Sequence, residues 1–289
     1  MIALKAFRTF LGISLLVALS SCTNLRSWPE SPLYVFPEPD AAWVAPQTLE
    51  AAMAAIEGRY AHYDVVAYQD VTTRRPMRTF IVSYGFTEFR IEDGRLVQTD
   101  SFCSAEQILN QTGSEAEFSD AATRAIQPRE EEVELSWADG KWRVYRPSTP
   151  TLLGIAGDPE EPLSTDPDDP NLLDPDGDGN PGVTVTIRVG NYLEGEIYIT
   201  RREIYSNFLE LNSDGNLYGY VVDESEQFVI GASRRIFRQE SNMEQIADPG
   251  MSPIVLVRLS DDIATCDQLM ARRDELFPSA PSFDVPITE

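Results

Sequence analysis

The residues with the clearest chemical signature are three aspartates at alternate positions, Asp174, Asp176 and Asp178, followed by Gly179. Carboxylate and carbonyl oxygens are the ligands that Ca²⁺ prefers, and three close carboxylates repel one another when no cation lies between them. The spacing therefore predicts a calcium site, to which Asn180 would add its backbone carbonyl. The alternative is a solvated acidic linker, because exposed loops are also rich in Pro, Gly and Asp.

This stretch resembles the Asp-x-Asp-x-Asp-Gly loop of EF-hands, with Asp174 at the first position and Asn180 at the seventh. The likeness ends where an EF-hand has its bidentate glutamate, because Val185 stands there. Residues 183–189 then alternate apolar and polar residues, as a strand does and the exiting helix of an EF-hand does not. The stretch also resembles the calcium loops of thrombospondin type 3 repeats. Both resemblances imply a bound calcium ion that needs further ligands, for which the nearby acids are Asp166, Asp168, Asp169, Glu194 and Glu196.

The first 21 residues have a basic start and an apolar run over residues 10–19, which is typical of a secretory signal peptide. The run is too short to span a membrane, which takes about 20 apolar residues. Leu19-Ser20-Ser21-Cys22 follows and resembles the lipobox of bacterial lipoproteins. That resemblance implies that Cys22 is acylated and that several acyl chains form a stable membrane anchor. The alternative is an ordinary signal peptide followed by an unmodified cysteine.

Thr23 stands where inner-membrane lipoproteins carry a retention aspartate. The resemblance therefore implies an outer-membrane protein that faces the periplasm or the cell surface.

The chain is strongly acidic, with a formal net charge of −24. Cleavage after residue 21 removes two basic residues and no acidic one, which leaves a charge of −26 and Lys141 as the single lysine. Nucleic acid is excluded as a partner, because phosphate binding needs a basic face. Electrostatic attachment to anionic lipid is excluded for the same reason.

Two cysteines remain once Cys22 is lipidated, namely Cys103 and Cys266. In an oxidising compartment an even pair predicts a disulfide, which here ties the first half of the chain to its C-terminal helix. The alternative is two buried free thiols.

Composition divides the chain into segments. Residues 22–46 are rich in proline and predict an extended tether, whereas residues 147–182 are rich in Pro, Asp and Gly. The predicted organisation is a signal peptide (1–21), a lipidated cysteine with its tether (22–46), a β domain (47–278) with the acidic calcium-loop insert (147–182), and a tail (279–289).

Period-2 patterns separated by tight turns predict a mainly β fold. The expected strands cover residues 60–68, 78–91, 96–103, 131–138, 141–146, 183–189, 196–200, 205–211, 217–222, 227–232 and 254–259. Asp93-Gly94 and Asp139-Gly140 are expected hairpin turns. Helices are expected over 48–58, 118–126 and 261–276. About ten strands fit a single antiparallel β-barrel or sandwich with a C-terminal helix and a short N-terminal helix.

The Gly58-Arg59-Tyr60 start, the late helix and the bridge to it resemble lipocalin-like barrels. That resemblance implies an interior that holds a small apolar ligand. The alternative is an interior filled by side chains.

Catalytic motifs are sparse. His62 is the only histidine, which excludes a multi-histidine metal site, and a histidine among tyrosines is typical of a plain strand residue. No Gly-x-Ser-x-Gly, Walker or paired Cys-x-x-Cys motif occurs. The sequence favours a non-enzymatic lipoprotein with a calcium-stabilised β domain that binds a protein partner or a small ligand. The alternative is a calcium-dependent hydrolase of envelope or extracellular polymers that uses two distant carboxylates.

Overall fold

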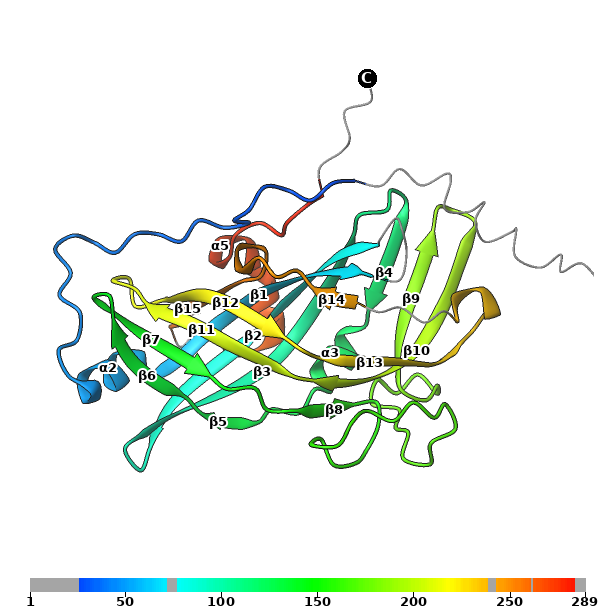
Figure 1. Cartoon of the computed structure of the whole chain (residues 1–289), viewed down its shortest axis with the longest axis horizontal. Helices are drawn as coiled ribbons and strands as arrows, with labels where there is room; N and C mark the ends of the chain where they lie inside the picture. Colours follow the sequence, from blue (N-terminus) through cyan, green and yellow to red (C-terminus); the bar gives the residue numbers. More distant parts are fainter. Residues whose placement is uncertain (1–25, 72–76, 239–242, 261, 284–289) are drawn as a thin grey trace, which may run out of the picture.

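The computed structural model describes residues 26–71, 77–238, 243–260 and 262–283. It shows one antiparallel sheet of 15 strands that is curled into a half-barrel, with short helices around it (Figure 1). Along the sheet the strands follow the order β13-β10-β9-β4-β3-β2-β1-β15-β12-β11-β7-β6. The mainly β prediction is confirmed, whereas the expected number of about ten strands was too low.

The elements are, in chain order, α2 (Leu49–Ile56), β1 (Gly58–Asp70), β2 (Arg78–Glu92), β3 (Arg95–Leu109), β4 (Ser114–Phe118), α3 (Asp120–Arg124), β5 (Glu130–Glu132), β6 (Glu134–Ala138), β7 (Lys141–Arg146), β8 (Thr151–Leu153), β9 (Val183–Val189), β10 (Leu193–Glu203), β11 (Tyr205–Leu211), β12 (Leu217–Asp223), β13 (Glu226–Ala232), η1 (Arg235–Phe237), β14 (Met243–Gln245), η2 (Pro249–Met251), β15 (Pro253–Arg258), α4 (Cys266–Ala271) and α5 (Arg273–Leu276).

The two predicted hairpin turns are confirmed by their backbone angles. Asp93 and Gly94 have φ values of 50° and 77°, and Asp139 and Gly140 have 52° and 79°. Positive φ at both central residues matches the right-handed twist of the flanking strands, which is why Asp-Gly is favoured there.

The expected helix over 118–126 is shorter than predicted, because residues 114–118 extend as β4 and only Asp120–Arg124 is helical. β4 pairs with both β3 and β9 and so bridges the two halves of the chain. Those backbone hydrogen bonds to distant strands override the local preference of this segment.

The helix expected over 261–276 is replaced by α4 and α5. Thr265 caps α4 through a capping box with Gln268, so this helix begins later than the Asp261-Asp262 pair had suggested. The short strands β8 and β14 were not foreseen, because three residues are too few to show a period-2 pattern.

The two flanks of the sheet meet at one corner. The chain passes from β10 to β11 through Ile204 alone, and from β12 to β13 through Glu224 and Ser225 (Figure 1). Glu224 N–H donates to Ile204 O at 2.8 Å, and Ile204 N–H donates to Ser225 Oγ at 2.9 Å. Each pair of strands therefore continues around the corner, which brings β10 opposite β1 across the interior.

The convex face of the sheet is covered by α4, α5 and the N-terminal segment. Phe277 stacks on Tyr63 at 5.5 Å between ring centroids, and Trp28 packs edge-on against Phe80 at 5.0 Å. The Cys103–Cys266 disulfide joins β3 to α4, as predicted. The aromatic residues of the tether region thus pack against the domain.

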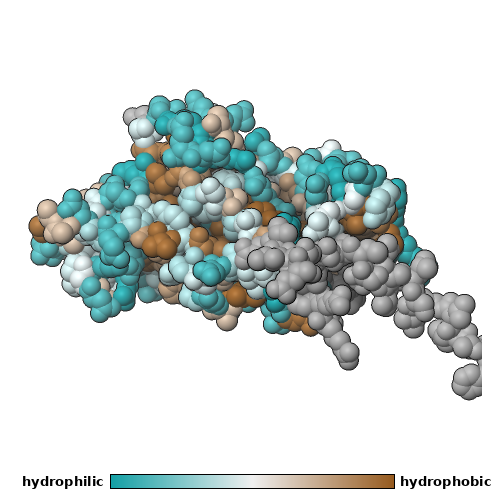
Figure 2. All heavy atoms as spheres, turned by 90° about the horizontal axis from the view of Figure 1, so that it is seen from above, coloured by the Kyte–Doolittle hydropathy of each residue, from teal (hydrophilic) through white to brown (hydrophobic). Residues whose placement is uncertain are grey.

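None of the helices in the described ranges has the length and hydropathy needed to cross a membrane. The face seen in Figure 2 is mostly hydrophilic, with hydrophobic side chains in separate clusters.

Candidate ligand cavity and metal loop

The concave face of the half-barrel forms a partly open cavity of about 500 Å³. Its lining is mainly apolar and comes from strands on both flanks of the sheet, for example Val66, Ile81, Phe102, Val185, Ile187 and Ile199. The predicted apolar interior is thus present, next to a region that side chains fill. In that filled region Tyr60, Phe89, Trp142 and Leu256 pack under α2.

The alternation along β1 explains how one strand serves both faces. Asp64, Val66 and Tyr68 line the cavity, whereas Tyr63 and Val65 belong to the core under α4 and α5. Successive side chains of a strand point to opposite faces, so a run that is buried throughout covers two different cores.

A buried polar layer separates the filled end of the interior from the cavity. His62 Nε2 lies 2.7 Å from Asp64 Oδ2, and His62 Nδ1 lies 2.8 Å from Thr87 Oγ1. Thr87 Oγ1 in turn donates to Asp100 Oδ1 at 2.6 Å. His62, Thr87 and Asp100 are at most 4% exposed, so this network is almost fully removed from solvent.

The network also contains a second cation. Arg146 Nε lies 3.3 Å from Asp100 Oδ2, and the Tyr205 hydroxyl donates to the same oxygen at 3.2 Å. The Arg146 guanidinium also stacks over the Tyr205 ring, 4.2 Å from its centroid. His62 and Arg146 thus balance Asp64 and Asp100, which is the condition for burying charges at acceptable cost.

The protonation of His62 follows from these contacts. Burial opposes its charge, but hydrogen bonds to Asp100 and Asp64 and the charges of both acids outweigh burial and raise the pKa of His62 to about 9. Burial likewise opposes the charge of Asp100, yet His62 and Arg146 hold the pKa of Asp100 well below its ordinary value. Both ring nitrogens of His62 are engaged by buried side chains of the network, which holds the imidazole in place within its strand.

A second charged group lines the cavity at the corner between β10 and β12. Arg201 donates to both carboxylate oxygens of Glu203, at 2.6 and 3.1 Å. The Ser225 hydroxyl lies 3.2 Å from Glu203 Oε2 and 3.0 Å from Asp223 Oδ2. Burial, and then the charge of Glu203, raise the pKa of Asp223. We call Arg201, Glu203, Asp223 and Ser225 the corner cluster.

Neither polar group was predicted from the sequence, because their members are far apart along the chain. One indication was available in the sequence, namely that residues two positions apart in a strand point to the same face of the sheet. Asp64 follows His62 by two residues and Asp223 follows Val221 by two, so each must share the inward face of an apolar strand.

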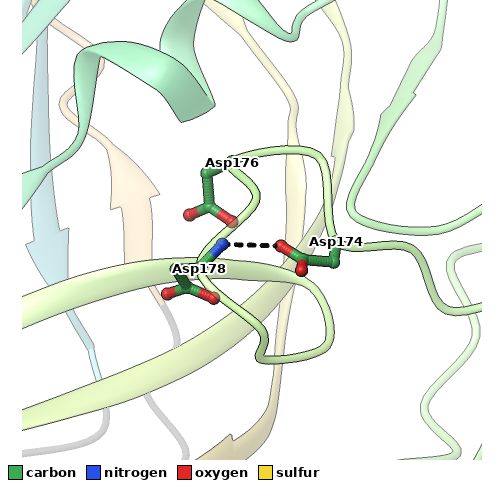
Figure 3. Close-up of side chains that lie close together, drawn as sticks. All are labelled: Asp174, Asp176 and Asp178. Atoms are coloured by element: carbon green, nitrogen blue, oxygen red, sulfur yellow. Dashed lines mark hydrogen bonds between the residues drawn. The ribbon is translucent and has the colours of Figure 1, made fainter.

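The acidic loop lies between β8 and β9, and its three predicted carboxylates converge (Figure 3). One oxygen from each of Asp174, Asp176 and Asp178 lies within 4.8 Å of the others. Asp174 accepts the backbone N–H groups of residues 177, 178 and 179 at 2.8, 3.1 and 2.9 Å. These bonds curl the loop so that its acidic side chains face one point.

The base of the loop is fixed by Gly182. Its N–H donates to Leu173 O at 2.6 Å, and it has a φ of 80°. A Cβ there would lie 2.5 Å from Ile199 O, so no other residue fits this position without a backbone shift.

The carboxylates are partly exposed and suit a hard cation. Asp176 Oδ2 accepts from Thr184 N at 2.9 Å, but its Oδ1 is buried without a hydrogen-bond partner. Burial raises the pKa of Asp176, and the charge of Asp178 contributes to the rise. An orphaned buried oxygen beside two further carboxylates fits a metal ion.

The other predicted ligands are not part of this cluster. Asn180 N–H donates to Asp178 Oδ1 at 2.8 Å, and the role of its carbonyl as a ligand stays a prediction. Asp166 and Asp169 accept backbone N–H groups within their own turns. Glu194 pairs with Arg188, and Glu196 accepts from the Tyr198 hydroxyl. The predicted lipidation site Cys22 lies outside the described residues.

The fold and the site together define a class, a β half-barrel with an internal apolar cavity and a separate acidic loop. Comparison with known proteins adds no family to that description. No family model, no curated protein and no solved structure matches the chain.

Proposed function

We propose that this is a non-enzymatic, lipid-anchored protein of the outer membrane whose half-barrel binds a small apolar ligand. The observation that supports this is the cavity of about 500 Å³ with its mainly apolar lining and a few polar groups. Concave sites of that size and composition are typical of small-molecule binding.

Anchoring rests on the lipobox resemblance at Cys22 and on the acidic, lysine-poor composition, which gives the chain no electrostatic hold on anionic lipid. Replacing Cys22 by serine should move the protein from the membrane fraction to the soluble fraction. Retention in the membrane fraction would contradict the anchor.

Calcium is proposed as a structural ion at Asp174, Asp176 and Asp178. It would offset two of the three negative charges beside β9 and give the orphaned Asp176 oxygen a partner. The cavity lies inside the half-barrel and the loop does not line it, so the ion is assigned to stability and not to ligand binding.

The cavity is tested with N-phenyl-1-naphthylamine, an uncharged dye that fluoresces in apolar surroundings. Ala116 lines the cavity, and Ala116→Trp should fill part of it and weaken dye binding at least tenfold. The matched control is Ala54→Trp on the exposed face of α2, which should leave dye binding unchanged. Equal dye affinity in both variants would reject the cavity as the binding site.

The hydrolase alternative has one observation in its favour. Asp223 is a half-buried carboxyl with a raised pKa beside a second acid, Glu203, and paired carboxyls of this kind occur in acid–base catalysis. Hydrolysis of an envelope polysaccharide or ester that requires calcium and is lost in Asp223→Asn would favour this alternative.

A further inference from the structure

The charges that line the cavity are unbalanced. Its described lining contains five acids and one basic residue, Arg201. Four of the acids have a cationic partner, in the pairs Asp64–His62, Glu106–Arg273, Glu203–Arg201 and Glu226–Arg202. Asp223 forms no close ion pair with any residue that the structure describes, and of the described cations only Arg201, which is paired with Glu203, acts on its charge.

The one lining cation is already engaged. All three side-chain nitrogens of Arg201 donate, two to Glu203 and the third to Gln227 at 2.9 Å. An anionic ligand would therefore meet a neutralised guanidinium and the unpaired charge of Asp223. Carboxylate and phosphate head groups are disfavoured on this ground.

The Asp223 carboxyl accepts hydrogen bonds from the Tyr68 hydroxyl and from Ser225. Ser225 N–H donates to Asp223 Oδ1 at 2.9 Å, and Ser225 Oγ lies 3.0 Å from Oδ2. That hydroxyl is shared with Glu203, and one hydroxyl proton cannot serve both acids fully. The corner cluster thus contains two carboxyl groups and one guanidinium group. When both carboxyls are ionised, it is one positive charge short of neutrality.

We propose that the cavity binds an amphiphile with one apolar chain and a protonated amine, and that the amine pairs with Asp223. This inference rests on the proposed ligand-binding function and names its ligand class. An ammonium group brings the missing charge and three donors, which match the oxygens of Asp223 and Glu203.

The apolar chain of the ligand would pack against apolar side chains of the cavity wall next to the corner cluster. Val66, Ile197 and Ile199 line the cavity on the strands that also carry Tyr68, Arg201 and Glu203. Each methylene buried there should tighten binding about fourfold until the cavity is filled.

The test uses the full-length oxidised protein and displacement of N-phenyl-1-naphthylamine by dodecylamine, dodecanol and dodecanoate. These probes share one chain and differ in the charge of the head group. We expect dodecylamine to bind at least tenfold more tightly than dodecanoate. Asp223→Asn should weaken dodecylamine about tenfold and leave dodecanol unchanged, whereas Glu224→Gln, which removes an exposed neighbouring charge, should change neither.

Equal or tighter binding of dodecanoate overturns the proposal, and so does an Asp223→Asn variant that binds dodecylamine as the unaltered protein does. The comparison of amine with carboxylate needs no variant, so it tests the preferred charge of the head group even when Asp223→Asn does not fold. Failure of the dye itself to bind would reject the proposed ligand-binding function, which is a separate outcome.

Discussion

Glu203 and Asp223 accept from one and the same hydroxyl, that of Ser225, at 3.2 and 3.0 Å. The two acids come from β10 and β12, and they meet because both strands turn the same corner of the sheet. The contact is therefore a direct product of the curvature of the half-barrel. It places two carboxyl groups, one of them without a close ion pair, at the wall of an apolar cavity.

The first prediction concerns calcium. Asp176→Asn should abolish any stabilisation by the ion, because it removes one of three converging carboxylates. If the dissociation constant is about 0.1–1 mM, as in extracellular calcium modules, 10 mM calcium stabilises the unaltered protein by about 2 kcal/mol. Thermal melts of residues 23–289 in calcium and in chelator measure this as a shift of several degrees.

The matched control for calcium is Asp169→Asn, an exposed acid that is outside the cluster of three. This variant should keep the calcium-dependent shift. Identical melting temperatures of the unaltered protein with and without calcium would show that the aspartates form only a hydrated linker.

The second prediction concerns the single histidine. Its pKa of about 9 lies above the ordinary 6.5, so protonated His62 stabilises the fold fully below pH 6.5, and this contribution is lost as the pH rises through 9. The NMR signal of His62 Cε1–H should titrate near pH 9 and reports the pKa without interference from other histidines. Urea unfolding should show stability falling over the same interval, and His62→Gln should remove that slope. Titration near pH 6.5 would refute the charged network.

The third prediction concerns the buried guanidinium. Arg146→Met leaves Asp100 with one cationic partner fewer and should lower the free energy of unfolding by about 3 kcal/mol. Arg143→Met on the same strand is the control. Arg143 is half-exposed and pairs with Glu210 and Asp139, so its loss should cost less than about 1 kcal/mol. If urea unfolding shows similar losses of stability for both variants, the buried Arg146–Asp100 pair contributes no more to the free energy of unfolding than an exposed pair does.

The fourth prediction concerns the disulfide, whose cysteines are 163 residues apart. In the chain-entropy model, closing so long a loop stabilises the fold by about 5 kcal/mol. The double variant with serine at Cys103 and Cys266 should therefore unfold at much lower urea concentration, and the unaltered protein should show the same drop after reduction. Unchanged stability after complete reduction would show that the disulfide forms between cysteines that the fold already brings together and adds no stability of its own.

The sequence by itself determined the features that depend on residues close to one another along the chain. The Asp-Gly turns and the convergence of Asp174, Asp176 and Asp178 depend on neighbours within a few residues, so spacing was enough to predict them. The compartment implied by the lipobox likewise made the Cys103–Cys266 pairing a reasonable expectation, and the structure contains that bridge. Period-2 patterns were enough to recognise a mainly β fold.

Only the tertiary structure decided what the interior contains. His62, Asp100 and Arg146 come from three different strands, and no spacing along the chain indicates that they form one buried network. The corner cluster depends on the curvature of the whole sheet, which joins strands from its two flanks. Period 2 tells which residues share a face, but the order of the strands decides which faces meet, and that order is fixed by hydrogen bonds between distant segments.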